Sequence, residues 1–330
     1  MKKILIIRLK GFGDILMTSP VWRNIKLNDH STEIHLLTDR KIAELSRMYK
    51  ELDKVYEMDT SSLIKQIELI SCLRKEKYDF VIDLFCNPRS SFLTLITNAP
   101  VRIGFNVRFR KHAYNKLISD EYRKKHEVMH HLASLAYIDM KIINDKIYLP
   151  DSIRKEFNLE IKDNSFFTVA PMGKWKCKRF PEKKMAEIIN QIHDKFKLSS
   201  VVLYGDSEEK KRAEYIKSLT GNSCLLSPES DFMQMASIIE KSLFLLTNDT
   251  AALHIAEALE KPIIAFFGPT NPLTQGPRYS RHLIIKNAEM ECLCCNKTVC
   301  KKNSCFENID MNKAKNEIEI FINSISNPEA

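Results

Sequence analysis

Two glycines and a carboxylate stand close together near the start of the sequence, in Lys10-Gly11-Phe12-Gly13-Asp14. Glycine lets the backbone approach a ligand closely, and a carboxylate beside a bound substrate can accept a proton from an attacking hydroxyl. The Gly-x-Gly spacing is an incomplete dinucleotide-binding fingerprint. Asp14 is therefore a candidate general base, and the alternative is that it caps the following helix.

A second stretch, Gly173–Pro181, is rich in cations. Lys174, Lys176, Lys178 and Arg179 fall within six residues of one another. Ammonium and guanidinium groups in such a cluster suit a phosphate or diphosphate group. The alternative interpretation is an ordinary solvated loop.

A third stretch, Thr247–His254, joins an apolar run to a helical pattern. Free backbone N–H groups at a helix start bind anions, Thr250 can add a hydroxyl donor, and His254 would lie one turn further along the same face. The alternative is that Asp249 caps the helix and His254 is simply packed. The turn-rich loop Phe266–Pro272 follows the next apolar run, so two neighbouring strand ends would frame one pocket.

Short apolar runs alternate with helical patterns along most of the chain, which predicts parallel sheets covered by helices. Ligands of such sheets bind at the carboxyl ends of the strands, where the three stretches are expected to lie. The clearest predicted strands are Lys3–Leu9, Phe80–Leu84, Phe166–Ala170, Leu243–Thr247 and Pro262–Phe267.

The alternation stops and restarts in mid-chain, which predicts two similar α/β domains. Residues 101–150 are less regular, with a helix expected near His130–Met140, and a polar connection follows from Pro150 to about Asn164. We therefore predict domains over residues 1–155 and 165–330. A last helix beginning near Asp310 would pack one apolar face, made of Ala314, Ile318, Phe321, Ile322 and Ile325.

The composition is that of a globular protein with an excess of positive charge. The 330 residues are 44% hydrophobic and 28% charged, with 51 Lys and Arg against 42 Asp and Glu, a formal +9. Eight cations and two acids between residues 102 and 125 supply +6 of that excess. A nucleic acid, an anionic membrane surface or a phosphorylated substrate would suit this charge, and the alternative is a solvated face.

The apolar runs are too short for a membrane span, which needs roughly 18 residues. The first residues also lack the apolar region and cleavage site of a signal peptide. We therefore expect a cytoplasmic protein that touches a membrane, if at all, from that side.

Nine cysteines are present, and a cytoplasmic location argues against a disulfide framework. Five of them cluster near the end of the chain, and four of these have the spacing Cys292-x2-Cys295-x4-Cys300-x4-Cys305. Four thiolates at such spacing could bind structural zinc or iron, and the alternative is that the thiols are reduced and free of metal.

Taken together, three stretches resemble glycosyltransferase family 9, the ADP-heptose:lipopolysaccharide heptosyltransferases. They are KILIIRLKGFGDILMTSP, APMGKWKCKRFP and LLTNDTAALHIAEALEKPIIAFFGPTNP, which occur in the order and at the spacing of the family. The resemblance implies the GT-B architecture, in which two Rossmann-like domains face a cleft. The first domain would bind the acceptor and the second the nucleotide sugar, with the terminal helix crossing back to the first.

The resemblance also implies an inverting reaction that needs no catalytic metal. Asp14 matches the catalytic base of the family. One departure from the family is Ala251, which replaces the glycine that usually follows Asp-Thr. For the acidic residue that contacts the donor, both Glu208 and Glu209 lie close after Gly205 and are candidates. The donor-binding residues implied by position are Lys178, Arg179, Glu209, Asp249, Thr250, Ala251 and His254.

The partners implied are an ADP-heptose donor and a lipid A–Kdo or heptosylated core acceptor at the inner membrane. Arg108, Arg110 and Lys111 are the candidate acceptor contacts, because the basic stretch falls in the acceptor domain. Similar cysteines occur in many family members, and related protein heptosyltransferases hold a metal on theirs. The alternatives are another nucleotide sugar, a protein acceptor, or a basic nucleic-acid-binding protein. We expect no nucleic-acid partner, because no recognised motif for one is present.

Overall fold

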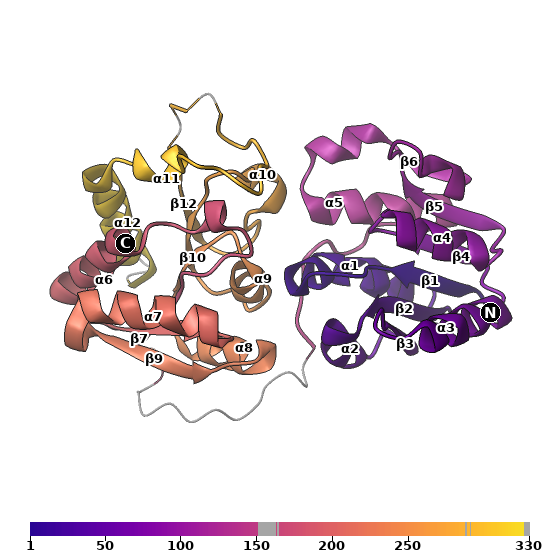
Figure 1. The fold of residues 1–330 in the computed structure, drawn as a ribbon, viewed down its shortest axis with the longest axis horizontal. Helices are drawn as coiled ribbons and strands as arrows, with labels where there is room; N and C mark the ends of the chain where they lie inside the picture. The colour runs from indigo at the N-terminus through magenta and orange to yellow at the C-terminus, as the bar shows by residue number, and fades with distance from the viewer. Residues whose placement is uncertain (151–162, 164, 288, 291, 327–330) are drawn as a thin grey trace. The chain divides into compact units, whose positions relative to one another are not determined.

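The computed structural model of the chain divides into two compact units, Met1–Ser152 and Ile153–Ala330 (Figure 1). It describes residues 1–150, 163, 165–287, 289–290 and 292–326. The connection expected between the two domains falls almost wholly on residues 151–162 and 164, which lie outside the described residues.

The first unit holds six parallel strands in the order β3-β2-β1-β4-β5-β6. The central strand, β1 (Lys3–Ile7), is an apolar run buried along its length, as expected where helices cover both faces of a parallel sheet. The other elements are α1 (Phe12–Asn28), β2 (Glu33–Asp39), α2 (Arg40–Arg47), β3 (Lys54–Met58), α3 (Leu63–Lys75), β4 (Phe80–Asp83), α4 (Pro88–Ile96), β5 (Val101–Phe105), β6 (Lys116–Ile118) and α5 (Glu127–Leu132).

The second unit repeats this arrangement, with the strand order β12-β11-β10-β7-β8-β9. Its elements are β7 (Phe166–Ala170), α6 (Glu182–Phe196), β8 (Ser199–Tyr204), α7 (Ser207–Thr220), β9 (Cys224–Glu229), α8 (Phe232–Lys241), β10 (Leu245–Asn248), α9 (Ala251–Ala258), β11 (Ile263–Phe266), α10 (Pro272–Gln275), β12 (His282–Ile285), α11 (Ser304–Glu307) and α12 (Met311–Ser326). The predicted α/β fold with two Rossmann-like halves is confirmed.

Both sheets reverse their strand order at one point. In the first unit β1 lies beside β4, and in the second β7 lies beside β10. The connections that leave these neighbouring strands therefore diverge at the carboxyl edge of each sheet. This is where open α/β sheets bind their ligands.

The sequence pattern did not reveal seven short elements: α4, β5, β6, β9, α10, β12 and α11. The strands among them lie toward or at the edges of the sheets, where apolar runs are shorter. The helix expected over His130–Met140 is instead α5 followed by a 3₁₀ helix at Ala133–Ile138. Polar side chains cap several of the helices; for example, Ser62 accepts from the Lys65 amide before α3, and Asn87 forms a capping box before α4.

The predicted face of the terminal helix α12 packs on the core of the second unit. Ala314, Ile318 and Ile322 are buried there, and the helix contacts α6 and β12. Simple packing onto a domain is thereby confirmed, whereas a crossing of this helix to the first unit stays a prediction. Over the described residues, none of the helices is both long and apolar enough to traverse a membrane.

Candidate active site

Asp14 lies inside the first turn of α1 and does not cap the helix. The helix begins at Phe12, two residues before Asp14, and its N-cap is Gly11. Gly11 has a φ of 90°, a conformation that residues other than glycine rarely adopt. A Cβ atom on Gly11 would also lie 2.0 Å from Oδ2 of Asp14. The interpretation of Asp14 as a cap is therefore wrong, and Gly11 makes room for its carboxylate.

The Asp14 carboxylate is held by a buried arginine that the sequence analysis did not select. Nη2 of Arg8 lies 2.9 Å from Oδ1 of Asp14, and Nη1 of Arg8 donates to the carbonyl of Leu84, just after β4. The side chain of Arg8 is 9% exposed and that of Asp14 36%. Arg8 thus joins the ends of the two strands at the reversal point and orients a carboxylate that solvent can still reach.

A second carboxylate lies behind Arg8. Oε1 of Glu127 is 3.8 Å from Nη2 of Arg8 and 3.2 Å from Nε2 of His131. Burial works to raise the pKa of Glu127, but hydrogen bonds to His130 and His131 and the charge of Arg8 hold it well below its usual value. Burial also lowers the pKa of His131. A neutral histidine beside an ionised glutamate is therefore the expected state near pH 7.

The sequence offered only a weak signal for Arg8, Glu127 and His131. Arg8 follows directly after the first strand, and the two others are four residues apart in a segment that looked irregular. Only the packing of α5 against α1 brings Glu127 toward the loop that follows β1.

In the second unit, two predicted donor-binding residues meet at the reversal point. Nζ of Lys178 lies 2.5 Å from Oδ2 of Asp249, and it also lies 4.7 Å from the centre of the Trp175 ring. Lys178 comes from the loop after β7, and Asp249 comes directly after β10. Both side chains are largely buried, which strengthens the attraction between their charges.

Asp249 is paired with Lys178 and does not cap α9, so the part of the alternative that made Asp249 the cap is wrong. The N-cap is Thr250, whose side chain makes no capping bond and whose Oγ1 lies 3.3 Å from Oγ1 of Thr247. Ala251 is the first residue of the helix, and His254 is buried one turn further on. The start of α9 therefore presents backbone N–H groups beside the Lys178–Asp249 pair.

Glu209 and Arg179 are placed by contacts to glycine backbone. Oε2 of Glu209 accepts from the amide of Gly205 at 2.8 Å, at the carboxyl end of β8, and burial raises the pKa of Glu209. The side chain of Glu208 is 87% exposed and pairs only loosely, at 3.7 Å, with a lysine. Nε of Arg179 donates to the carbonyl of Gly173 at 2.8 Å. Of the two glutamates, Glu209 therefore faces the strand end.

The candidate acceptor residues Arg108, Arg110 and Lys111 lie in the turn and 3₁₀ helix that follow the carboxyl end of β5. The guanidinium of Arg108 stacks on the ring of Phe109, which is 78% exposed. Other cations of the basic stretch are engaged within the protein; for example, Arg102 donates to two backbone carbonyls. Fewer positive charges are therefore available to an acceptor than the count over residues 102–125 suggests.

The four cysteines considered for a metal lie in one region of the second unit, where burial and then the charges of Cys300, Cys292 and Cys295 raise the pKa of the Cys305 thiol. Within the described part of the chain, the one group of three or more side chains with metal-binding atoms less than 4.8 Å apart is Glu33, His35 and Glu76. Cys292, Cys295 and Cys300 are exposed and Cys305 is half-buried. Among the described residues no three of these sulfur atoms lie within 4.8 Å of one another, so the ligands are not already gathered around one point, and a structural zinc or iron on these cysteines stays a prediction.

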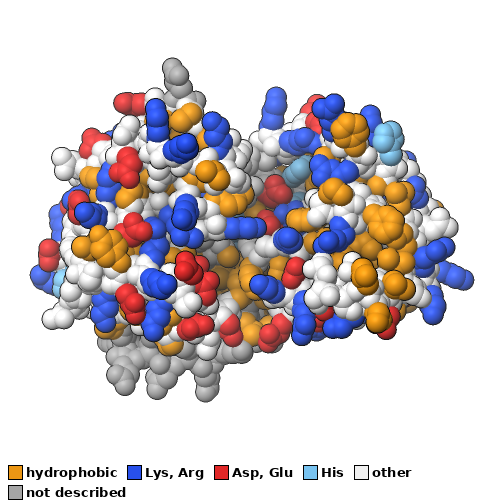
Figure 2. Space-filling view, viewed as in Figure 1, with side chains coloured by type: hydrophobic (Ala, Val, Ile, Leu, Met, Phe, Trp, Pro, Cys, Tyr) orange, Lys and Arg blue, Asp and Glu red, His pale blue; other side chains and the backbone are white. Residues whose placement is uncertain are grey.

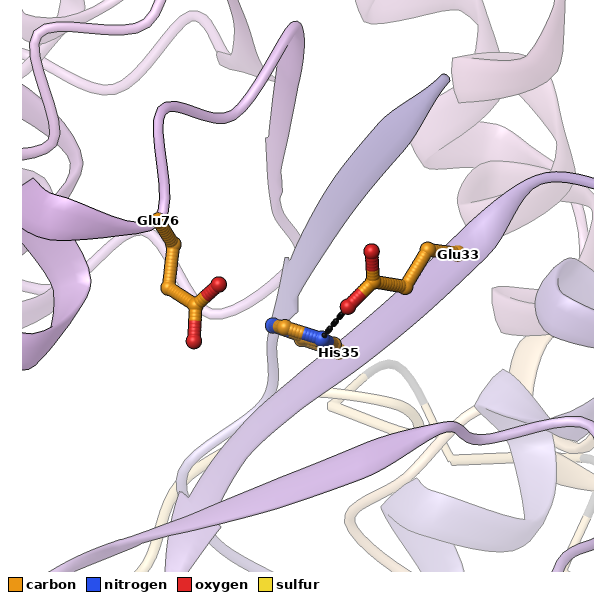
Figure 3. A group of neighbouring side chains, drawn as sticks. All are labelled: Glu33, His35 and Glu76. Atoms are coloured by element: carbon orange, nitrogen blue, oxygen red, sulfur yellow. Dashed lines mark hydrogen bonds and ion pairs between the residues drawn. The ribbon is translucent and has the colours of Figure 1, made fainter. Parts of the chain in front are cut away.

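The Glu33, His35 and Glu76 group lies at the amino edge of the first sheet, away from Asp14 (Figure 3). Nε2 of His35 is 2.7 Å from Oε1 of Glu33, whereas Glu76 accepts from Lys3 at 2.8 Å and from Lys54 at 2.9 Å. Two lysines therefore balance the two carboxylates. This is an ion-pair network rather than a site with charge left for a cation.

Two parallel six-stranded sheets of this order, each with polar residues at its reversal point, define a GT-B-like fold. The sequence model described as "Glycosyltransferase family 9 (heptosyltransferase)" matches residues 67–305, and the chain belongs to this family. Asp14 lies before the matched residues.

Individual relatives are distant. The putative lipopolysaccharide heptosyltransferase 4 of Escherichia coli is 24% identical over 282 residues, covering 82% of this chain and 74% of the relative. The structure of the E. coli ADP-heptose lipopolysaccharide heptosyltransferase II superposes with a TM-score of 0.78 at 19% identity, covering 100% of both chains. That of the E. coli heptosyltransferase WaaC with ADP superposes with a TM-score of 0.75 at 17% identity, covering 97% of this chain and 99% of the other.

Proposed function

We propose that this enzyme transfers heptose from ADP-heptose to the inner core of lipopolysaccharide, at the cytoplasmic face of the inner membrane. Membership of a heptosyltransferase family supports the reaction class. The observation that carries the proposal is Asp14, whose Oδ1 is held by Arg8 and whose carboxylate is one-third exposed at the carboxyl edge of the first sheet.

In the proposed reaction Asp14 accepts the proton of the acceptor hydroxyl as its oxygen attacks the anomeric carbon. The bond from that carbon to the β-phosphate oxygen breaks, and its electron pair leaves with ADP. Attack from the side opposite the leaving group inverts the anomeric centre. Arg8 keeps one carboxylate oxygen occupied, so that the other is the one that receives the proton.

On the donor side, the diphosphate is proposed to compete with Asp249 for the ammonium of Lys178. The pair is 2.5 Å apart, so Lys178 is already oriented toward the start of α9 before the donor arrives. The N–H groups of that helix and Arg179 would share the developing charge on ADP. Ala251 still donates its backbone N–H, but its methyl group narrows the space beside the sugar. Another nucleotide sugar is therefore the second outcome to test.

The acceptor is proposed to be lipid A–Kdo or a heptosylated core, whose carboxylates and phosphates suit Arg108, Arg110 and Lys111. Neutralising these three residues should raise the acceptor KM and leave the donor KM unchanged. An unchanged acceptor KM would favour the alternative interpretation, in which this segment is an ordinary solvated surface.

The deciding experiment is an ADP-release assay over several nucleotide sugars with a lipid A–Kdo acceptor. ADP-heptose should give the highest kcat/KM, and Asp14→Asn should lower kcat by about 10²–10⁴-fold with ADP binding retained. Asp39→Asn, which alters only a helix cap, is the matched control. Turnover by Asp14→Asn equal to the wild type would sink the assignment of the base, and preference for another sugar would change the donor.

A further inference from the structure

Helix α3 exposes an unusual number of aliphatic side chains. Of its apolar residues, only Leu69 and Leu73 are buried, whereas Leu63, Ile64 and Ile67 are 78%, 70% and 65% exposed. A helix on the surface of a globular domain normally turns polar residues outward. The outward face of α3 therefore looks like a surface that meets something other than water.

Helix α4 extends this surface. It packs beside α3, and its Phe92 and Leu95 are 56% and 48% exposed. Figure 2 shows hydrophobic side chains gathered over the region that these two helices occupy in Figure 1. We call these five residues (Leu63, Ile64, Ile67, Phe92 and Leu95) the α3–α4 patch. Apolar side chains gathered in this way mark interaction sites, whereas single exposed ones do not.

The charge around the patch is positive. The two helices carry four exposed cations, Lys65, Arg74, Lys75 and Arg89, against one exposed acid, Glu68. The whole first unit has 26 Lys and Arg against 19 Asp and Glu, a formal +7, whereas the second has 25 against 23, a formal +2. An occupant of the α3–α4 patch is therefore expected to be both apolar and anionic.

We propose that the α3–α4 patch docks the first unit on an anionic lipid bilayer, with the apolar side chains among the acyl chains and the cations at the headgroups. A second copy of the chain fits less well, because a twofold contact would oppose these cations to one another. The inference rests on the proposed function in that the acceptor is a lipid, but lipid binding is measurable without any sugar transfer.

The position of the patch suits this role. Helices α3 and α4 begin just after the carboxyl ends of β3 and β4, and Leu63 and Ile64 lie in the first turn of α3. The patch therefore starts at the same edge of the first sheet as Asp14 and the turn that carries Arg108. A bilayer at the patch would bring its headgroups toward the proposed acceptor residues.

The test is flotation of the full chain with vesicles of phosphatidylethanolamine and phosphatidylglycerol, compared with vesicles of phosphatidylcholine alone. The wild type should float with the anionic vesicles and much less with the neutral ones. The triple variant Ile64→Ser, Ile67→Ser, Phe92→Ser should lose about tenfold or more in binding. Arg74→Gln with Arg89→Gln should lose about fivefold per cation on the anionic vesicles, whereas Lys65, which pairs with Asp59 at 3.1 Å, is left unchanged.

The matched control is Leu273→Ser with Val299→Ser, which removes equally exposed apolar side chains from the second unit. It should bind as the wild type does, and all variants should keep the wild-type melting temperature because the altered side chains are exposed. Failure of the wild type to float, or flotation of the triple variant at the wild-type level, would overturn the proposal. A wild-type dimer by light scattering that the triple variant converts to a monomer, with vesicle binding unchanged, would assign the patch to a second copy.

Transfer to a soluble, delipidated acceptor separates this proposal from the proposed function. The triple variant should keep the wild-type kcat on that acceptor. If no chain transfers heptose but the wild type still floats, the reaction is wrong and the docking surface stands.

Discussion

Replacing Gly11 with alanine tests the placement of Asp14 without removing its carboxylate. The added Cβ would lie 2.0 Å from Oδ2, 2.7 Å from Cγ and 3.1 Å from Cβ of Asp14. Contacts below 3 Å cannot persist, so the aspartate must rotate, and its bond to Arg8 must lengthen. The backbone at Gly11, with φ 90° and ψ 115°, is an additional strain for any residue with a side chain.

Both effects have expected magnitudes. A non-glycine residue in such a backbone region costs about 1–3 kcal/mol, and an off-rotamer side chain costs about 0.5–1.5 kcal/mol. Gly11→Ala should therefore lower the free energy of unfolding by roughly 1.5–4.5 kcal/mol, the sum of the two. A displacement of the proposed base by about 1 Å should lower kcat by about 10²-fold. The affinity for ADP should not change, because the donor residues belong to the second unit.

The chain offers a matched control in Gly221, which also has a positive φ, 61°, but has nothing within 4 Å of an added Cβ. Gly221, with ψ −132°, lies outside the left-handed α region in a conformation that is essentially restricted to glycine, so Gly221→Ala should cost about 1–3 kcal/mol and leave kcat at the wild-type value. Stability is measured by urea denaturation, kcat by initial rates of ADP release, and ADP affinity by titration calorimetry. A Gly11→Ala enzyme with kcat within about twofold of the wild type would refute the reasoning, because Asp14 could then move without consequence.

Three further predictions concern other parts of the molecule. Lys178→Ala should weaken ADP binding by about 10-fold or more in titration calorimetry. The control Lys174→Ala, at an exposed position of the same loop, should bind ADP as the wild type does. If both variants bind ADP equally well, Lys178 is not part of the donor site. Glu127→Gln removes the second carboxylate near Arg8, the arginine that holds Asp14. We therefore expect kcat to fall and the acidic limb of the kcat–pH profile to shift. A change in stability with no change in kcat would show that Glu127 has only a structural role. Burial lowers the pKa of His35 in the folded chain, so unfolding takes up a proton below about pH 6.5, and the stability present above that pH should be lost as the pH falls. His35→Gln should flatten this part of the melting temperature–pH curve, and a curve as steep as that of the wild type would exclude His35 as its origin.

Parts of the site could be predicted from local patterns because single segments contain them. The glycine turn with Asp14 follows a strongly apolar strand, and the cation-rich loop and the Thr247–His254 segment each follow another. Strand ends in a parallel sheet meet at one edge, so the presence of Lys178 and Asp249 at the same edge follows from topology, although their contact does not. The choice between Glu208 and Glu209 could not be made from the sequence, because it depends on which side chain folds back onto the amide of Gly205.

Three features depended on contacts between distant segments, and the sequence patterns missed or misjudged them. Arg8 meets Glu127 across more than a hundred residues, because α5 packs on α1. The spacing of the four cysteines did not show that three of them are exposed or that no three of their sulfur atoms lie within 4.8 Å of one another among the described residues, and a metal on them stays a prediction. The sequence patterns also gave no sign that α3 exposes its aliphatic side chains, because periodicity cannot distinguish a buried face from an exposed one.

The sequence by itself determined the two α/β halves, the family and the segments that hold the ionisable groups, because apolar periodicity, glycine turns and short motifs are local properties. Only the tertiary structure decided which groups touch: Arg8 with Asp14, Lys178 with Asp249, and Glu33 with His35. It also decided that α3 and α4 expose their aliphatic side chains. The physical reason is that charge pairing and burial depend on distances between side chains, and those distances are set by the packing of the whole fold.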